Sequence, residues 1–356
     1  MYKGLVTIWR RFRNSLSGLK GGTLRRYAET AGYLLFLAEQ AVSRTTTGRA
    51  AVVFALAKRY AKCNHLVMSL SCYDAALASQ PSSHKLAGER LAHKRRVLPR
   101  TVARDRSDFA SLRTFCGFIG YPRSGHSLLG AIIDAHPNAC ISHEADVLRY
   151  VSERKSLSSA DVLELISENS EVFYRLGRRW QGHDYDIPRI PIAAKELQVI
   201  GDKKGDSTLP IIARHPELFD DLSTLLGLEI KIIHCYRNPF DNIARMALRD
   251  DVALDTALER YFALASLVRN VSSSQRVSLY HISNEELITQ RAVALEGIFH
   301  FLDLDCPATL RSAFNSMLYD TPNRSRFDIE WSDDQVQEVK RRKSGFDWLH
   351  GYDFHT

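Results

Sequence analysis

Residues 117–127 read Gly-Phe-Ile-Gly-Tyr-Pro-Arg-Ser-Gly-His-Ser and lie between an apolar run, 114–121, and an amphipathic segment, 128–135. The apolar run predicts a strand, the small residues predict a tight turn, and the amphipathic segment predicts a helix. The free N–H groups and the dipole of a helix N-terminus attract anions. This stretch therefore predicts an anion-binding loop at the end of a strand.

The loop nearly fits the nucleotide-binding P-loop. The spacing of Gly120, Gly125 and Ser127 matches G-x-x-x-x-G-K-[ST], but His126 replaces the lysine, and the cation is Arg123 instead. An NTPase without that lysine loses its main contact to the β- and γ-phosphates. The alternative interpretation is a glycine-containing turn that binds nothing.

The chain continues over 128–144 as Leu-Leu-Gly-Ala-Ile-Ile-Asp-Ala-His-Pro-Asn-Ala-Cys-Ile-Ser-His-Glu. This predicts a helix, a stop at Pro137, a short strand and then an acidic residue. Together with the loop, the stretch resembles the P-R-S-G-[TS]-[TS]-L…H-P…E pattern of PAPS-dependent sulfotransferases. These include protein-tyrosine sulfotransferases and bacterial enzymes that carry tetratricopeptide repeats.

The resemblance implies PAPS as cofactor, and it implies roles for the loop residues. Arg123 would contact the 5′-phosphosulfate, with Ser124, Gly125 and Ser127 beside it. His126 departs from the usual Thr or Ser, and we expect its charge to depend on pH.

The resemblance also places the general base at Glu144. His143 is a rival base because it is adjacent. Neighbours on a strand point to opposite faces, so we expect only one of the two side chains to reach the acceptor.

A second part of the site is predicted near residue 237. A β-rich run, 228–236, leads into a helix with Pro239 in its first turn, and this resembles the family's strand followed by R-[DN]-P-x-[DE]. The resemblance implies that Arg237 holds the 3′-phosphate. The family has a Ser eight residues later, where this chain has Arg245. Arg245 either binds the same phosphate by its charge or pairs with Asp241 one turn away.

Further candidates lie elsewhere in the chain. A strand over 196–201 ends in a polar turn, and the resemblance to the family's N-K-x-P strand end makes Lys203 the cation that stabilises the leaving phosphate. Asp202 has an alternative interpretation as a Walker-B acid. Ser325 lies in a loop where related enzymes contact the cofactor. The basic segment 340–343 either reaches the 3′-phosphate or is a solvated helix end.

The pattern of the whole chain predicts an α/β fold. Helical stretches alternate with five β-rich runs: 114–121, 139–142, 196–201, 229–236 and 276–282. Such alternation predicts a P-loop-like parallel sheet sandwiched by helices. The segment 153–195 is longer than a usual connection and contains Arg178 and Tyr185, so we expect it to cover the acceptor.

The N-terminal third differs in charge from the rest. Residues 1–113 hold 21 Lys and Arg against 6 Asp and Glu, whereas the remainder holds 27 against 35. We predict a basic, all-helical region at 1–110 and a sulfotransferase-like domain at 111–356. Residues 50–81 fit one tetratricopeptide unit or a single helical hairpin. The basic region predicts contact with an acidic partner or membrane surface, or a solvated face. It lacks the pattern of a nucleic-acid module.

Other classes are disfavoured. No apolar run reaches the roughly 18–20 residues that a membrane helix needs, and no signal peptide follows the basic start, so we expect a cytoplasmic protein. The six cysteines are scattered, and no metal site is predicted.

Three interpretations remain. The first is a sulfotransferase that moves a sulfuryl group from PAPS, by in-line displacement, to a hydroxyl or amine of a small molecule, glycan or protein side chain. The second is a P-loop kinase or NTPase. The third is a catalytically inactive scaffold.

Overall fold

The computed structural model describes residues 109–153, 157–175, 178–180, 183–185, 187–190, 196–274, 276–317 and 320–355. The basic helical region predicted at 1–110, with its tetratricopeptide-like unit, lies outside the described residues except for its last two positions. The described fold is therefore that of residues 109–355.

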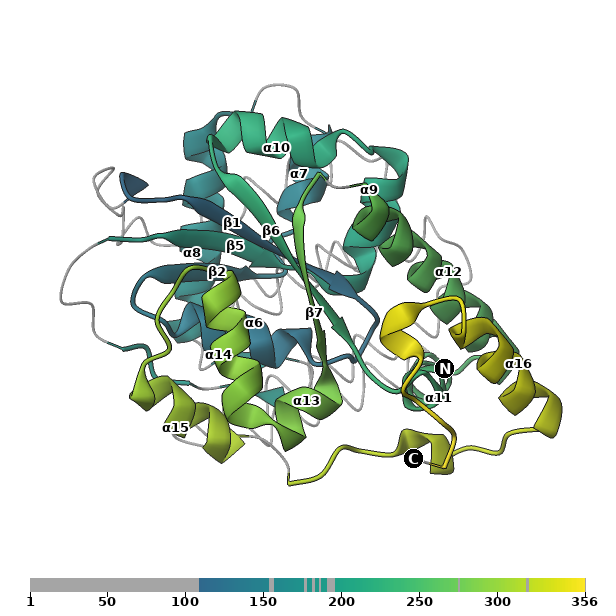
Figure 1. Cartoon of the computed structure of the whole chain (residues 1–356). Helices are drawn as coiled ribbons and strands as arrows, with labels where there is room; N and C mark the ends of the chain where they lie inside the picture. Colours follow the sequence, from purple (N-terminus) through teal and green to yellow (C-terminus); the bar gives the residue numbers. More distant parts are fainter. Residues whose placement is uncertain are drawn as a thin grey trace, which may run out of the picture. The chain divides into compact units, whose positions relative to one another are not determined.

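Five parallel strands form the central sheet, as the sequence predicts (Figure 1). Their order across the sheet is β2-β5-β1-β6-β7. The strands are β1 (Thr114–Gly120), β2 (Ala139–His143), β5 (Val199–Lys203), β6 (Glu229–Tyr236) and β7 (Ser278–Ser283). The predicted α/β fold is confirmed.

Helices connect the strands and cover the sheet. They are α6 (His126–Asp134), α7 (Val147–Glu153), α8 (Ser159–Arg175), α9 (Thr208–Arg214), α10 (Leu218–Leu226), α11 (Pro239–Asp250), α12 (Leu254–Ser273), α13 (Asn284–Thr289), α14 (Arg291–Phe301), α15 (Ala308–Met317) and α16 (Asp333–Lys343). Short elements are the β3–β4 hairpin (Arg179–Trp180 and His183–Asp184) and the 3₁₀ turns η3 (Gly205–Ser207), η4 (Ser325–Phe327) and η5 (Asp347–Leu349).

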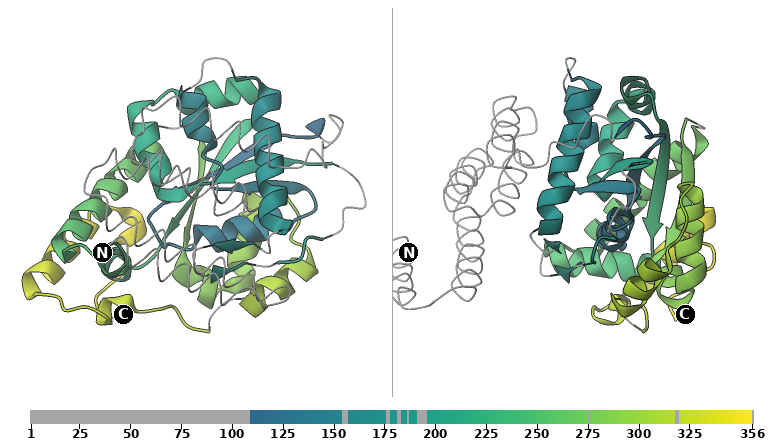
Figure 2. Two further views of the ribbon diagram at one scale, coloured as in Figure 1. Left: turned by 180° about the vertical axis from the view of Figure 1, so that it is seen from behind. Right: turned by 90° about the vertical axis from the view of Figure 1, so that its left-hand side faces the viewer.

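The core beside β1, β6 and β7 is built with α6, α14 and α15. Phe118, Ile233 and Ile132 are buried there together with Phe299 and Phe314. Burial of each such side chain stabilises the fold by about 1.5–3 kcal/mol. Helix α8 contacts β2 and β5, and the edge-on view in Figure 2 shows it on the opposite side of the sheet from α14 and α15. The sheet is thus covered on both faces.

Strand β5 extends two residues further than predicted. Asp202 and Lys203 belong to the strand rather than to the polar turn that follows it. Both residues pair in parallel with β2, where Asp202 lies opposite Ser142 and Lys203 lies opposite His143. Charged side chains are tolerated there because each has partners on another strand or loop.

Local sequence explains how α11 begins. Asn238 is its N-cap, and the Asn238 side chain accepts a hydrogen bond from the Phe240 N–H. Pro239 occupies the first helical position, where its missing N–H costs nothing. The turn predicted after β6 is confirmed.

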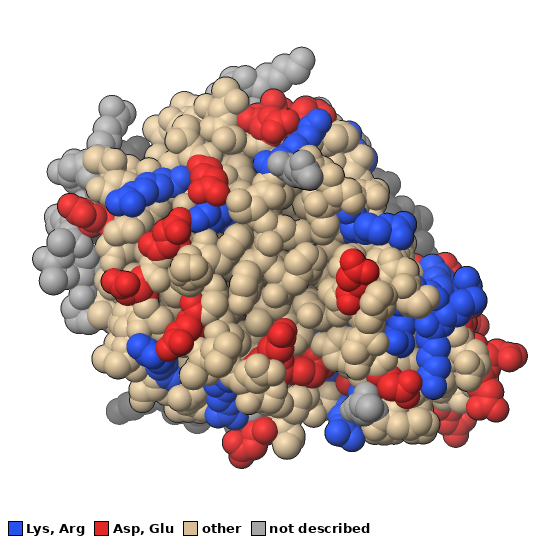
Figure 3. Space-filling model, in the orientation of Figure 1, with Lys and Arg blue, Asp and Glu red and all other residues tan. Residues whose placement is uncertain are grey.

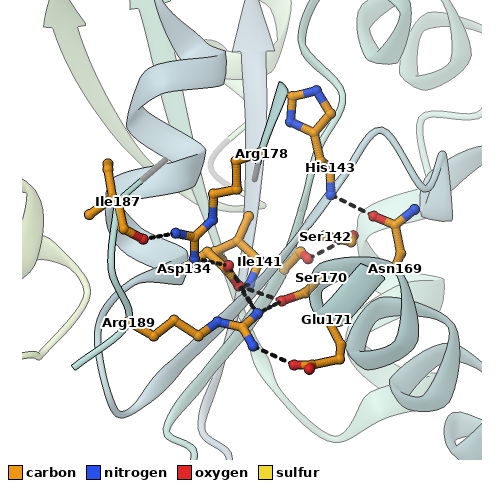
Figure 4. Close-up of polar contacts among 11 residues, drawn as sticks. Asp134, Ile141, Ser142, His143, Asn169, Ser170, Glu171, Arg178, Ile187 and Arg189 are labelled. Carbon is orange, nitrogen blue, oxygen red and sulfur yellow. Dashed lines mark hydrogen bonds and ion pairs between the residues drawn. The ribbon is translucent and has the colours of Figure 1, made fainter. Parts of the chain in front are cut away.

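The insertion between α7 and β5 is anchored on Asp134, at the C-terminal end of α6 (Figure 4). Arg178 is fully buried and its Nη2 lies 2.6 Å from Asp134 Oδ2, while Arg189 Nη2 lies 3.1 Å from the same oxygen. Ser170 on α8 donates a hydrogen bond to Asp134 Oδ1. Arg178 therefore fastens the insertion to the C-terminal end of α6. That the segment 153–195 covers an acceptor stays a prediction.

Replacing Asp134 by Ala should destabilise the protein strongly. The change leaves the Arg178 guanidinium buried without its carboxylate, which typically costs about 3–5 kcal/mol. Glu171→Ala is the matched control, because Glu171 and its partner Arg189 are both partly exposed, so its loss should cost less than about 1 kcal/mol. Urea unfolding measures both. If both variants lose the same free energy of unfolding, the anchoring role of Asp134 is contradicted.

Candidate active site

The predicted site residues gather at one edge of the sheet. Parallel strands end at the same edge, and ligands of open α/β sheets bind there. Arg123 follows β1, Glu144 follows β2, Lys203 ends β5, and Arg237 follows β6. Because β5 lies between β2 and β1, Lys203 comes between Glu144 and the β1–α6 loop.

The β1–α6 loop, residues 121–125, has an irregular backbone. Gly125 has a φ of 99°, and a Cβ at this position would come within 2.8 Å of the Asn284 side-chain nitrogen. Arg123 has a φ of 68°, which is uncommon for a residue with a side chain. Such conformations persist only where the surroundings hold them, and they cluster at functional sites.

Two residues where the loop joins α6 turn into the protein. Ser124 is buried, and its hydroxyl donates to the Tyr121 carbonyl oxygen at 2.8 Å. His126 is also buried, with its Nδ1 3.2 Å from the Ser124 hydroxyl, and its ring packs against Gly205. Burial and the nearby charge of Lys203 lower the pKa of His126 to about 3. The imidazole is therefore neutral at physiological pH, and its charge changes with pH only in acid.

Lys203 connects the loop to the end of β2. Its side chain is 1% exposed, and its Nζ donates to Ser127 Oγ at 3.1 Å and to Glu144 Oε1 at 2.9 Å. The aliphatic part of Lys203 crosses α6 at Gly130, where a Cβ would come within 2.9 Å of it. Burial lowers the pKa of Lys203 even though Glu144 opposes this effect. The charge of this ammonium is therefore only partly compensated.

Glu144 is held by two lysines. Its second oxygen lies 3.3 Å from Lys204 Nζ. Burial would raise the pKa of Glu144, but Lys203, Lys204 and His143 together hold it far below its usual range. Glu144 is therefore an ionised carboxylate at neutral pH.

His143 also reaches Lys203, with its Nε2 3.4 Å from Lys203 Nζ. The expectation that neighbouring side chains separate here is wrong, because Glu144 lies just beyond β2 with a φ of 56°. This bend in the backbone ends the alternation of side chains between the two faces of β2. His143 stacks on Phe173, and burial lowers its pKa well below the ordinary value, which makes it a weak base.

Asp202 organises the backbone that carries Glu144. Its Oδ1 accepts hydrogen bonds from the Ser142 hydroxyl and the Ala145 N–H, and its Oδ2 accepts one from the Val147 N–H, all within 2.9 Å. A Walker-B acid would instead direct its carboxylate to a metal beside the phosphate loop. The geometry favours a positioning role for Asp202.

Arg237 and Ser325 are brought together through Asn323. Arg237 Nη2 donates to the Asn323 carbonyl oxygen, and the Ser325 hydroxyl donates to Asn323 Oδ1 at 2.8 Å. Arg237 is nearly buried, and its Nε–H is among the buried polar atoms without a hydrogen-bond partner in the described part of the chain. A buried unpaired guanidinium N–H is costly unless a ligand satisfies it.

Arg245 does not pair with Asp241. The Asp241 carboxylate instead binds Arg326 Nη1 at 2.7 Å and lies 3.8 Å from Arg237 Nη2. Among the described residues, no ion pair joins Arg245 to Asp241. The alternative of an intrahelical pair is therefore wrong, and Arg245 remains a candidate for anion binding.

The basic segment 340–343 is the last turn of α16, and Figure 3 shows basic side chains gathered over this part of the surface. Lys340 pairs with Asp353, Arg341 with Glu338 and Arg342 with Glu259. Lys343 donates to the His350 carbonyl oxygen. These partners favour the interpretation as a helix end.

Sequence reasoning missed several residues that shape the site. Lys204 binds Glu144, Asn284 requires a glycine at 125, and Asn242 donates from α11 to the Pro122 carbonyl oxygen at 2.9 Å. Lys204 could have been found because it adjoins Lys203. The other contacts join residues far apart in the sequence, so no local pattern marks them.

Two negative findings apply to the described residues. No helix among them has the length and apolar character needed to span a bilayer. Nor do three or more His, Cys, Asp and Glu side chains there lie close enough together to hold a metal ion.

Sulfotransferases are among the solved structures to which this chain is similar. The sulfotransferase domain of the Synechococcus PCC 7002 olefin synthase is 15% identical with a TM-score of 0.40, over 66% of this chain and 95% of that one. Sulfotransferase STF9 from Mycobacterium avium is 11% identical with a TM-score of 0.38, over 74% and 84%. Mouse SULT7A1, solved with PAP, is 16% identical with a TM-score of 0.35, over 66% and 84%. No family model and no curated protein matches the sequence.

Replacing His126 by Asn should change how stability depends on pH. The pKa of His126 falls from 6.5 to about 3 on folding. Between these values the unfolded chain binds a proton that the folded chain does not, so acidification destabilises the wild type. One such group contributes up to about 1.4 kcal/mol per pH unit. Above pH 6.5 this contribution is constant.

The measurement is chemical denaturation of both proteins at pH 7.5, 5.5 and 4.5. The difference in unfolding free energy between wild type and His126→Asn should shrink by roughly 1 kcal/mol or more between pH 5.5 and 4.5. If the difference in unfolding free energy stays constant with pH, His126 has the same pKa in the folded and the unfolded chain.

Proposed function

We propose that this protein is a sulfotransferase that uses PAPS as donor and a hydroxyl or amine as acceptor. The observation that carries the proposal is the Lys203 ammonium, which is buried between Ser127 of the anion-binding loop and the Glu144 carboxylate. This ammonium thus links the loop that would bind an anion to a carboxylate that would accept a proton.

The residues at the sheet edge fit the charges of the donor. Arg123, the N–H groups at the start of α6 and the Ser127 hydroxyl would hold the 5′-phosphosulfate. Arg237, with its unpaired Nε–H, would hold the 3′-phosphate, with Arg245 and Ser325 as further candidates beside it. Ser124 and His126 support the loop from inside.

Lys203 and Arg123 would stabilise the charge that develops on the leaving oxygen. Burial lowers the pKa of both cations, so additional negative charge near them is favourable. Donors that are fixed in place before the reaction stabilise a transition state most effectively. A lysine already held by Ser127 and Glu144 meets this condition.

Glu144 would accept the proton of the acceptor. When bound, PAPS would supply the sulfuryl group, whose bond to the 5′-phosphate oxygen breaks as a bond from the acceptor oxygen or nitrogen to sulfur forms. The low pKa of Glu144 makes it a weak base while both lysines contact it. A bound anion beside Lys203 would offset part of the lysine's charge and so raise the basicity of Glu144. Proton transfer and donor binding would therefore be coupled.

The kinase or NTPase alternative is less well supported. It needs a loop lysine, and it needs a carboxylate directed at a metal. His126 is buried and neutral, and the oxygens of Asp202 accept three hydrogen bonds, from Ser142 on β2, from Ala145 and from Val147 at the start of α7. An inactive scaffold would bind no cofactor, or would bind it without turnover.

The test is thermal unfolding of the full chain with PAP, PAPS, ATP and ATP–Mg²⁺, each titrated separately. A ligand that binds only the folded state raises the unfolding midpoint. We expect a shift with PAP that disappears in Arg237→Ala and persists in Arg341→Ala, an exposed arginine on α16. A shift with ATP–Mg²⁺ alone would indicate the kinase function, and no shift would indicate the scaffold.

The role of Glu144 is tested by Glu144→Gln. We expect sulfuryl transfer to fall by roughly 10²–10⁴-fold, the usual contribution of a general base. PAP binding should be retained or strengthened, because Lys203 loses a competing anion. Glu171→Gln, which alters a carboxylate on α8, should leave both properties unchanged. Full activity of Glu144→Gln would contradict the role.

A further inference from the structure

The segment 346–354 follows α16 and is anchored to the central sheet (Figure 1, yellow). The Trp348 ring stacks on His281 of β7, with 5.5 Å between the ring centroids, and Trp348 Nε1 donates a hydrogen bond to the Tyr121 hydroxyl at 3.3 Å. Leu349 is fully buried. A segment whose side chains are locked by packing can hold its own partners in fixed positions.

This segment contacts the chain on both sides of Arg237. The Tyr352 ring meets the edge of the Tyr236 ring, with 6.2 Å between the centroids. The carbonyl oxygen of Asp353 accepts a hydrogen bond from Asn238 Nδ2 at 3.1 Å. Tyr236 and Asn238 are the two neighbours of Arg237 in the sequence, so the segment supports the backbone before and after the arginine.

A carboxylate joins Asn238 to the same segment a second time. Glu285 lies in the first turn of α13, close after the end of β7. Its Oε1 accepts a hydrogen bond from the Asn238 N–H at 2.9 Å, and its Oε2 accepts one from the Tyr352 hydroxyl at 2.8 Å. The Asn238 N–H belongs to the peptide group that joins Asn238 to Arg237. Glu285 and Tyr352 therefore hold the peptide group directly after the arginine.

Arg237 lies where the sheet no longer fixes the backbone. The last paired residues of β6 and β7 are Tyr236 and Ser283, so Arg237 is one position beyond the pairing. Its side chain is nearly buried, its Nη2 donates to the Asn323 carbonyl oxygen, and its Nε–H has no hydrogen-bond partner in the described part of the chain. In so confined a place a small backbone shift changes what the guanidinium can reach. Misplacement of a binding group by about 1 Å can lower the rate of an enzyme roughly 10²-fold.

We propose that Glu285 and Tyr352 are positioning residues for the 3′-phosphate of the donor. They act through the peptide group between Arg237 and Asn238, and they set where the Arg237 guanidinium is presented. This inference rests on the proposed function and adds two residues that determine how strongly the 3′-phosphate is bound. A purely electrostatic role of Glu285 would have the opposite effect, because removal of its negative charge would strengthen phosphate binding.

The test compares the binding of PAP with that of adenosine 5′-phosphate, which lacks the 3′-phosphate, by calorimetry on the full chain. The ratio of the two dissociation constants measures what the 3′-phosphate contributes. Tyr352→Phe removes one hydroxyl and keeps the ring. We expect it to reduce the preference for PAP by roughly three- to tenfold, as the loss of one hydrogen bond does, and to leave adenosine 5′-phosphate binding unchanged. A general loss of folded protein would weaken both ligands alike and would not change the ratio.

Tyr280→Phe is the matched control, because Tyr280 lies on β7 with its ring stacked on Phe301 of α14. It should keep the full preference for PAP. Glu285→Gln leaves one accepting oxygen where the wild type has two, and it should reduce the preference at least as much as Tyr352→Phe does. Adding Tyr352→Phe to Glu285→Gln should change the ratio little further, because the hydroxyl acts through the carboxylate.

The outcomes separate the two claims. If the wild type does not bind PAP, or binds it no better than adenosine 5′-phosphate, the proposed function fails at its 3′-phosphate site. If the wild type prefers PAP and Tyr352→Phe keeps the whole preference, the positioning inference alone is overturned. The same holds if Glu285→Gln strengthens PAP binding, or if the effects of the two substitutions add in full.

Discussion

The site depends on one buried ammonium. Lys203 Nζ is held between the Ser127 hydroxyl and the Glu144 carboxylate, and it is almost inaccessible to solvent. Burying a charge is costly unless partners surround it, so β5, the β1–α6 loop and the end of β2 must keep their relative positions. Gly130 on α6 contributes by leaving room for the lysine stem. The incomplete compensation of this charge makes the region suitable for an additional anion.

Helix α6 serves the site at both of its ends. Its N-terminus follows the anion-binding loop, and Asp134 near its C-terminus fastens the insertion through Arg178 and Arg189. A helix that is tied at both ends moves little, and rigid elements position reactive groups better than loops do. Arg123 and Glu144, which both face the site, have positive φ angles.

Many features of the fold and site could be predicted because they depend on neighbouring residues. The apolar runs predicted all five strands of the sheet, and Pro239 marked the start of α11. Since all five strands run parallel, residues at their ends had to meet at one edge, which placed Arg123, Lys203 and Arg237 near one another. The predictions for the N-terminal third stay untested, because it lies outside the described residues.

The sequence by itself determined the strand–turn–helix of the loop, the parallel α/β architecture and the edge of the sheet where charge collects. Only the tertiary structure decided which side chains meet there. It showed that His143 and Glu144 both reach Lys203, that Asp202 supports the loop after β2, and that Arg178 is a buried anchor. The physical reason is that backbone preference and side-chain alternation act over a few residues, whereas the partner of a buried charge is chosen by packing between distant segments.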